Sequence, residues 1–270
     1  MIRRACFPIS STIEAPASFL EKGQAGQMVV PVRYGLLEHE ALGPVLIDTG
    51  YTPRLLTQKG WKLALYRMAL DPQFHPHLLP QTMLNNWGYR LEDVQHVVVT
   101  HLHADHVCGL DLFPNATFHL SQVCLDSWKA PARWSDARHG LFRSLLPAAG
   151  ARLQPMEAAH RQRPMGFGDN PGWDVLGDGS VWMVSLEGHM AGHAGVAFQC
   201  QERQVLYAAD VAWTRQGYRQ QRLPPAPLRW AVGNTTQAAA AGQAVLTAER
   251  LGWDVLLCHD PETTRWDCQP

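Results

Sequence analysis

The 270-residue sequence contains no uninterrupted apolar stretch as long as a membrane-spanning helix needs. Residues 1–16 hold two arginines but no apolar core of the kind found in secretory signals, so we expect no such signal. The formal net charge is only -1 at pH 7, which gives no general attraction for nucleic acid or anionic lipid. We therefore expect a cytoplasmic protein with no nucleic-acid partner and no membrane insertion.

Cysteine pairs of the Cys-x-x-Cys type are also missing. Most of the cysteines lie in or beside apolar segments, where a free thiol packs as a small hydrophobic group. The six are widely spaced, at Cys6, Cys108, Cys124, Cys200, Cys258 and Cys268. In a chain of this size, such spacing predicts reduced thiols rather than a disulfide framework.

The sequence has no internal repeat, no low-complexity tract and no clear linker, which predicts one domain over residues 1–270. Apolar runs bounded by turn residues predict strands, and apolar residues at helical spacing predict helices. We expect strands at 28–37, 44–47, 94–100, 116–120, 180–186, 195–200, 204–209 and 253–259, and helices at 61–69, 79–87, 121–130, 137–146 and 235–252. This order suits a layered α/β fold with sheets inside and helices outside.

Residues 131–175 interrupt the pattern, because they are rich in Pro, Gly, Arg and Trp. A loop of this length in a compact domain is usually functional, so we expect a lid or a pocket wall. Trp134 and Trp173 in this stretch are candidates for lining a substrate pocket, with ordinary packing as the alternative.

Four side chains that can bind metal lie within the segment THLHADH, residues 100–106. They directly follow a buried β-branched run, and open α/β sheets bind ligands at the ends of such strands. Residues two apart on extended backbone point the same way, so His101 and His103 can hold one ion. Asp105 and His106, beyond the turn, can face a second ion. A solvated polar loop is the competing interpretation.

Three later segments also place a histidine or an aspartate at the end of an apolar strand. They supply His189 within SLEGHMAGH, Asp210 at the end of VLYAAD, and His259 after DVLLC. One such residue is usually a hydrogen-bonded structural group. Four segments of one chain that each place a potential ligand at a strand end favour a single shared site.

This ordered set resembles the metallo-β-lactamase superfamily, and the resemblance runs from GPVLIDTG (43–50) to CHD (258–260). It implies an αββα sandwich, with two mixed sheets inside and helices outside, and a dinuclear metal site at one edge of the sheets. By position, it implies that His101, His103 and His189 hold one metal. It likewise implies that Asp105, His106 and His259 hold the other, with Asp210 as a bridge between them.

Two further residues have supporting roles in this resemblance. It implies that Asp48, in the DTG turn, hydrogen-bonds a ligand histidine; an aspartate that caps its own turn is the alternative. His193, the second histidine of GHMAGH, lies outside the implied ligand set, and we expect it to support or pack beside the ligands.

Histidine nitrogens and carboxylate oxygens suit zinc, which we expect here, and also iron, manganese or cobalt. Two such ions can lower the pKa of a shared water, and the resulting hydroxide attacks a carbonyl or phosphoryl centre. The ligand set therefore predicts a hydrolase. Asp210 bridges the metals in this scheme, and Asp105 is the local candidate for protonating the leaving group.

Within the superfamily, the sequence most resembles the quorum-quenching N-acyl-homoserine lactonases, which implies hydrolysis of a lactone or carboxylic ester. Those lactonases carry a tyrosine three residues after the bridging aspartate, whereas this sequence has Trp213. An indole donates one hydrogen bond but accepts none, so Trp213 is a candidate substrate contact of a different kind, with core packing as the alternative.

Other members of the superfamily stay open as alternatives. They are a small-molecule phosphodiesterase or thioesterase, and a non-catalytic metal-binding sensor. We expect a small, partly apolar substrate as the partner, and a homodimer stays open. A second His-x-His, at His75 and His77, has no acidic neighbour and encloses a proline, so we expect it in an exposed loop.

Overall fold

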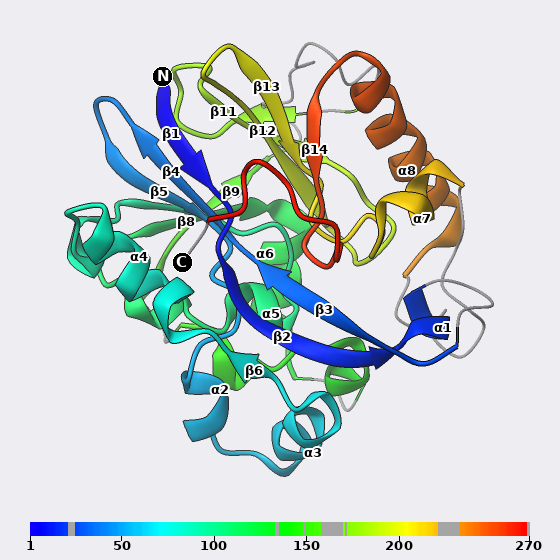
Figure 1. The fold of residues 1–270 in the computed structure, drawn as a ribbon. Helices are drawn as coiled ribbons and strands as arrows, with labels where there is room; N and C mark the ends of the chain where they lie inside the picture. The colour runs from blue at the N-terminus through cyan, green and yellow to red at the C-terminus, as the bar shows by residue number, and fades with distance from the viewer. Residues whose placement is uncertain are drawn as a thin grey trace.

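The computed structural model describes residues 1–20, 25–132, 135–147, 150–157, 170, 172–220 and 233–268 (Figure 1). Its strands are β1 (Ile2–Cys6), β2 (Ile9–Pro16), β3 (Gln27–Arg33), β4 (Gly35–His39), β5 (Gly43–Ile47), β6 (Gln73–Phe74), β7 (His96–Val98), β8 (Thr117–Ser121), β9 (Arg152–Met156), β10 (Gly172–Asp174), β11 (Val181–Ser185), β12 (Ala194–Cys200), β13 (Arg203–Tyr207) and β14 (Asp254–Leu256). Its α-helices are α1 (Ala17–Leu20), α2 (Arg54–Thr57), α3 (Trp61–Leu70), α4 (Pro80–Asn86), α5 (Ala104–Val107), α6 (Gln122–Lys129), α7 (Arg215–Arg219) and α8 (Thr235–Arg250).

The strands form a mixed sheet in two halves, with a smaller sheet beside it. One half has the order β1-β4-β5-β7-β8-β9, and the other has the order β10-β11-β12-β13-β14. The halves meet where β1 runs parallel to β12, with Ile2 opposite Cys200. The long β2–β3 hairpin and β6 make the separate antiparallel sheet. In Figure 1, α8 lies beside β14 at the upper right, α4 lies at the left, and α3 lies at the bottom.

Strands buried on both faces create the layers of this αββα sandwich. On β13 and β14, Leu206 and Val255 point outward and pack with Val245 of α8. Their neighbours Tyr207 and Leu256 point the other way, into the main core. The expected fold class, with mixed sheets inside and helices outside, is confirmed.

Two expected elements differ from the structure. The strand expected at 28–37 is divided into β3 and β4, because the chain leaves the small sheet for the large one at Tyr34. The helix expected at 137–146 is wrong: two short 3-10 turns, Asp136–His139 and Arg143–Leu145, occupy this stretch. Gly140 separates them with φ at +67°, a left-handed conformation that ends a helix.

Parallel pairing brings the proposed ligands to one edge. β5, β7 and β8 run parallel, so the segments that follow them leave at the same edge. β13 and β14 also run parallel to each other, which sets Asp210 and His259 side by side just beyond their ends. Segments far apart in the sequence therefore converge there.

The expectation of six reduced thiols is wrong for two of them. Cys6 at the end of β1 and Cys268 form a disulfide, with their Cα atoms 5.6 Å apart. Sequence spacing could not reveal this pair, because it links segments 262 residues apart. The other four cysteines are free and buried. Among the described residues, no helix is both long enough and apolar enough to cross a bilayer.

Candidate metal centre

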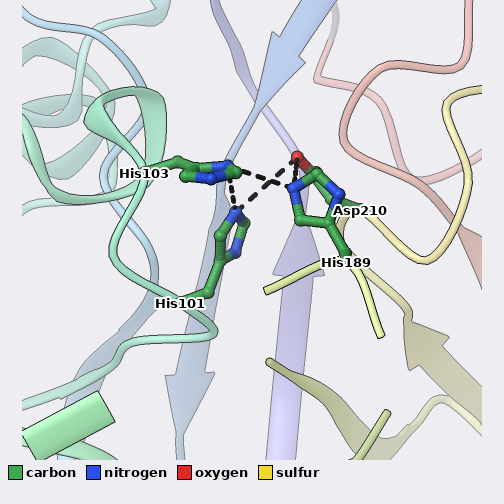
Figure 2. A group of neighbouring side chains, drawn as sticks. All are labelled: His101, His103, His189 and Asp210. Atoms are coloured by element: carbon green, nitrogen blue, oxygen red, sulfur yellow. Dashed lines mark hydrogen bonds and ion pairs between the residues drawn. The ribbon is translucent and has the colours of Figure 1, made fainter. Parts of the chain in front are cut away.

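Four of the proposed ligands converge in one group, with their polar atoms facing one another (Figure 2). The Nδ1 atom of His103 lies 3.0 Å from Nε2 of His101 and 3.0 Å from Nε2 of His189. The Oδ2 atom of Asp210 lies 3.3 Å from Nε2 of His189 and 3.7 Å from Nε2 of His101. We call this set group 1.

A second group lies beside the first. It contains Asp105, His106 and His259, together with Cys258, whose thiol was expected only to pack. Nε2 of His259 lies 3.2 Å from Oδ2 of Asp105, and Nε2 of His106 lies 3.6 Å from the same oxygen. We call this set group 2. In the sequence, only one feature could have marked Cys258 as a possible ligand: it directly precedes a proposed ligand at the end of a strand.

Asp210 lies between the two groups. Its Oδ2 is 3.3 Å from Nε2 of His259, and its Oδ1 is 3.4 Å from Nε2 of His106. One carboxylate thus faces histidines of both groups, as a bridging ligand would.

The donor atoms fit a pair of cations. Nε2 of His106 and Oδ1 of Asp210 are buried, face each other at 3.4 Å and have no hydrogen-bond partner among the described residues, and buried polar atoms are rarely left unpaired. Burial raises the pKa of Asp210, but His259 and His106 outweigh it and hold that pKa well below its usual value. Burial lowers the pKa of His103 to about 3, so this ring is neutral and has a lone pair to offer.

Asp48 holds the THLHADH segment in place. Its Oδ1 accepts a hydrogen bond from the backbone N–H of Thr100 at 2.8 Å, and its Oδ2 accepts one from the Thr100 hydroxyl at 2.7 Å. The same Oδ2 lies 2.7 Å from Nδ1 of His106. That contact places a proton on Nδ1 and leaves Nε2 free to bind a metal.

His193 lies beside the donor groups rather than in them. Its Nδ1 donates to the carbonyl oxygen of Leu186 at 2.8 Å, and its Nε2 accepts from the backbone N–H of Asp210 at 3.2 Å. Because both nitrogens are engaged, the ring joins the turn that carries His189 to the segment that carries Asp210.

The turn around His189 depends on Gly188, whose φ is +139°. A Cβ atom there would lie 2.2 Å from the backbone nitrogen of Ala238 in α8, so only glycine fits without a shift. Asn234 donates its backbone N–H to the carbonyl oxygen of Gly188 and caps α8 with its side chain. The start of α8 therefore fixes the position of this turn.

An open pocket of about 590 Å³ leads to group 1. His103 and His189 lie in its wall, beside the apolar side chains of Leu141 and Met190. Leu141 belongs to the described part of the 131–175 excursion, so this excursion does contribute to the pocket wall. Whether it also closes as a lid stays a prediction.

The structure gives the surroundings of Trp173 and Trp213, and their expected contact with substrate stays a prediction. Trp173 lines a separate pocket of about 190 Å³ beside His193, and its indole N–H donates to the carbonyl oxygen of Glu157 at 2.7 Å. Trp213 is half-buried between β13 and α7 and is not among the described residues that line the larger pocket. Trp134 lies outside the described residues. Of the second His-x-His, His75 is half-buried and His77 is exposed in a 3-10 turn that follows β6.

A family model described as the metallo-beta-lactamase superfamily matches residues 29–257. The chain belongs to the metallo-β-lactamase superfamily. The match begins in β3 and ends just after β14, so it spans the segments that carry Asp48, His101, His189 and Asp210.

Curated relatives carry hydrolase names. A "probable metallo-hydrolase" of Mycobacterium tuberculosis is 32% identical over 175 residues, which are 64% of this chain. The chain spans about half of that relative's length, with 54% of it covered. The N-acyl homoserine lactonase AttM of Agrobacterium fabrum is 26% identical over 249 residues, covering 90% of this chain and 87% of AttM.

Solved structures share the fold at low sequence identity. A quorum-quenching N-acyl homoserine lactone lactonase superimposes with a TM-score of 0.74 at 17% identity, covering 100% of this chain and 96% of the other. A variant of Bacillus thuringiensis AiiA, with N-decanoyl-L-homoserine bound at its active site, has a TM-score of 0.73 at 16% identity, covering 97% and 94%.

Proposed function

We propose that this metallo-hydrolase uses two divalent metal ions, zinc in the first instance, to hydrolyse a lactone or an open-chain carboxylic ester. The observation that carries the proposal is the position of Asp210 between groups 1 and 2, with the pocket opening onto group 1. AttM is named as an N-acyl homoserine lactonase, and this name supports an acylated lactone as the first substrate to test.

Individual residues have separate roles in the proposed hydrolysis. When bound, two metal ions provide a hydroxide at neutral pH and polarise the substrate carbonyl. Asp210 keeps the two groups at a fixed separation. Asp105, whose Oδ2 faces His259, receives the proton released during attack and passes it to the leaving oxygen. The reaction adds one water molecule and yields a hydroxy acid, or an acid and an alcohol.

The pocket suits a partly apolar neutral substrate. Leu141, Met190 and Val123 provide an apolar wall on which an acyl chain could pack. Arg143, the one Lys or Arg among the described lining residues, is engaged: it donates to Oδ2 of Asp136 at 3.0 Å and to the carbonyl oxygen of Trp128 at 2.8 Å. Apart from the proposed metals, the described lining therefore offers a phosphodiester no available side-chain cation, which favours the ester.

A substrate panel tests this proposal. The zinc-loaded protein is assayed for kcat/KM on N-acyl homoserine lactones of different chain length, a simple aryl ester, a thioester and a phosphodiester. We expect the highest value on an acylated lactone or ester. Asp210→Asn should lower kcat/KM by roughly 100-fold or more while the fold is kept, because the bridging charge is lost. Asp254→Asn, on β14 but facing Arg203, is the matched control and should keep full activity.

Three outcomes would contradict the proposal. A clear preference for the phosphodiester would assign the alternative activity. Two bound metals with no turnover on any substrate would assign the sensor role. Near wild-type turnover by Asp210→Asn would refute the bridging role.

A further inference from the structure

We infer that the Cys258 thiolate is a further protein ligand of the group 2 metal, in addition to Asp105, His106, His259 and the bridging Asp210. The inference rests on the metal centre of the proposed function but not on which bond that centre hydrolyses.

The geometry places the sulfur among the other donors. Asp105, His106, Cys258 and His259 each offer one donor atom, and these atoms all lie within 4.8 Å of one another. Four donors that bind one zinc ion at about 2.0–2.3 Å must lie within such a distance of each other. Cys258 reaches them because it follows β14 with its side chain on the inner face, where Leu256 also points.

A second, independent observation points to a cation at this place. Nε2 of His106 is fully buried, belongs to group 2 and has no hydrogen-bond partner in the part of the chain that the structure describes, while its Nδ1 is held by Asp48. The sulfur of Cys258 is itself weakly engaged, 3.4 Å from the carbonyl oxygen of Arg33. Since S–H is a weak donor, losing this contact on metal binding costs little.

Ordinary packing explains the other free cysteines better than it explains Cys258. Cys108 contacts Thr52, and Cys124 contacts the carbonyl oxygen of Gly192. Among the described residues, neither they nor Cys200 belong to a group that could hold a metal, whereas Cys258 does.

Within group 2, the sulfur lies on the buried side. His103 and His189 of group 1 line the open pocket, but no member of group 2 is among its described lining residues. Cys258 and His106 are 0% exposed, whereas Asp105 and His259 are each 7% exposed. The sulfur therefore reaches the group 2 metal from its buried side, while Asp105 and His259 lie toward its more exposed side.

The chemistry of sulfur makes this a statement about metal identity. Thiolate ligands favour zinc over harder ions such as manganese. On binding, the thiol releases its proton to solvent and the sulfur forms one bond to the metal, with no oxidation or reduction. Cys258 would thus bias group 2 toward zinc, which His and Asp ligands alone do not do.

Zinc X-ray absorption of the protein loaded with two zinc equivalents tests the inference directly. We expect one sulfur neighbour at about 2.3 Å for every two zinc ions, besides nitrogen and oxygen neighbours at about 2.0–2.2 Å. Cys258→Ser should remove the sulfur signal and weaken the binding of one of the two zinc ions by roughly 10-fold or more. Cys124→Ser, also a buried free thiol, is the matched control and should keep the signal.

A wild-type spectrum with two bound zinc ions and only nitrogen and oxygen neighbours would overturn the inference, as would a sulfur signal that persists in Cys258→Ser. Should Cys258→Ser fail to fold, the wild-type spectrum and that of Cys124→Ser still decide the matter. If the sulfur signal is present but no ester is hydrolysed, the proposed function is refuted and this inference stands. If esters are hydrolysed but the sulfur signal is missing, this inference is refuted and the proposed function stands.

Discussion

At the scale of single residues, the centre is built from histidines whose outer nitrogens are held by neighbours. Nδ1 of His259 lies 2.9 Å from the carbonyl oxygen of Pro31, and Nδ1 of His106 lies 2.7 Å from Asp48. Residue types and their order were enough to predict the seven side chains that the structure brings together. They could not reveal Cys258, because a buried thiol next to a ligand looks the same in sequence as one that packs.

Asp48→Asn tests this support at one position. Asparagine tolerates the positive φ of Asp48, but its amide N–H₂ would face the proton on Nδ1 of His106 or the Thr100 hydroxyl. We expect zinc affinity to fall roughly 10- to 100-fold, measured by competition with a chelator. Asp71→Asn, also at positive φ but at the end of α3, is the control. An unchanged zinc affinity in Asp48→Asn would refute the supporting role.

At the scale of elements, strands carry the site and local sequence predicts them well. The run of valines at 97–99 predicted the buried strand β7, and Ser121 predicted the start of α6, where its hydroxyl accepts from the N–H of Cys124. The pairing of β1 with β12, and the two turns in place of a helix at 137–146, were not predictable. The strand pairing depends on contacts between distant segments, and the two turns depend on the backbone conformation at a glycine. Hydrophobic periodicity records neither.

The pair formed by His96 and His119 on β7 and β8 predicts a pH effect on stability. Burial, and then the charge of His96, lower the pKa of His119 to about 4. The unfolded chain, with a histidine pKa near 6.5, therefore binds more protons than the folded chain between pH 6.5 and 4. Stability from this residue is complete above pH 6.5 and is lost as the pH falls toward 4, by about 3 kcal/mol in total.

Urea unfolding of the wild type and of His119→Gln across this pH range provides the measurement. The variant should show a smaller loss of unfolding free energy between pH 6.5 and 4, and the metal-ligand histidines, common to both proteins, cancel in the difference. Parallel curves for the two proteins would contradict the account.

At the scale of the whole molecule, two half-sheets packed between helices bring residues from 48 to 259 to one edge. The layers were predictable, because strands that are apolar on both faces must pack against other elements on both sides. The disulfide between Cys6 and Cys268 was not, since only the fold brings them together. The proposed function depends on this scale, because the assembled edge would have to hold two metals, both needed for hydrolysis.

Zinc titration of the metal-free protein tests that claim most directly, with bound zinc and lactone or ester hydrolysis measured on the same samples. The account predicts that zinc binds tightly up to two ions per chain and that full activity requires the second ion. Full activity with one ion per chain, or undiminished activity after both are removed by a chelator, would contradict it.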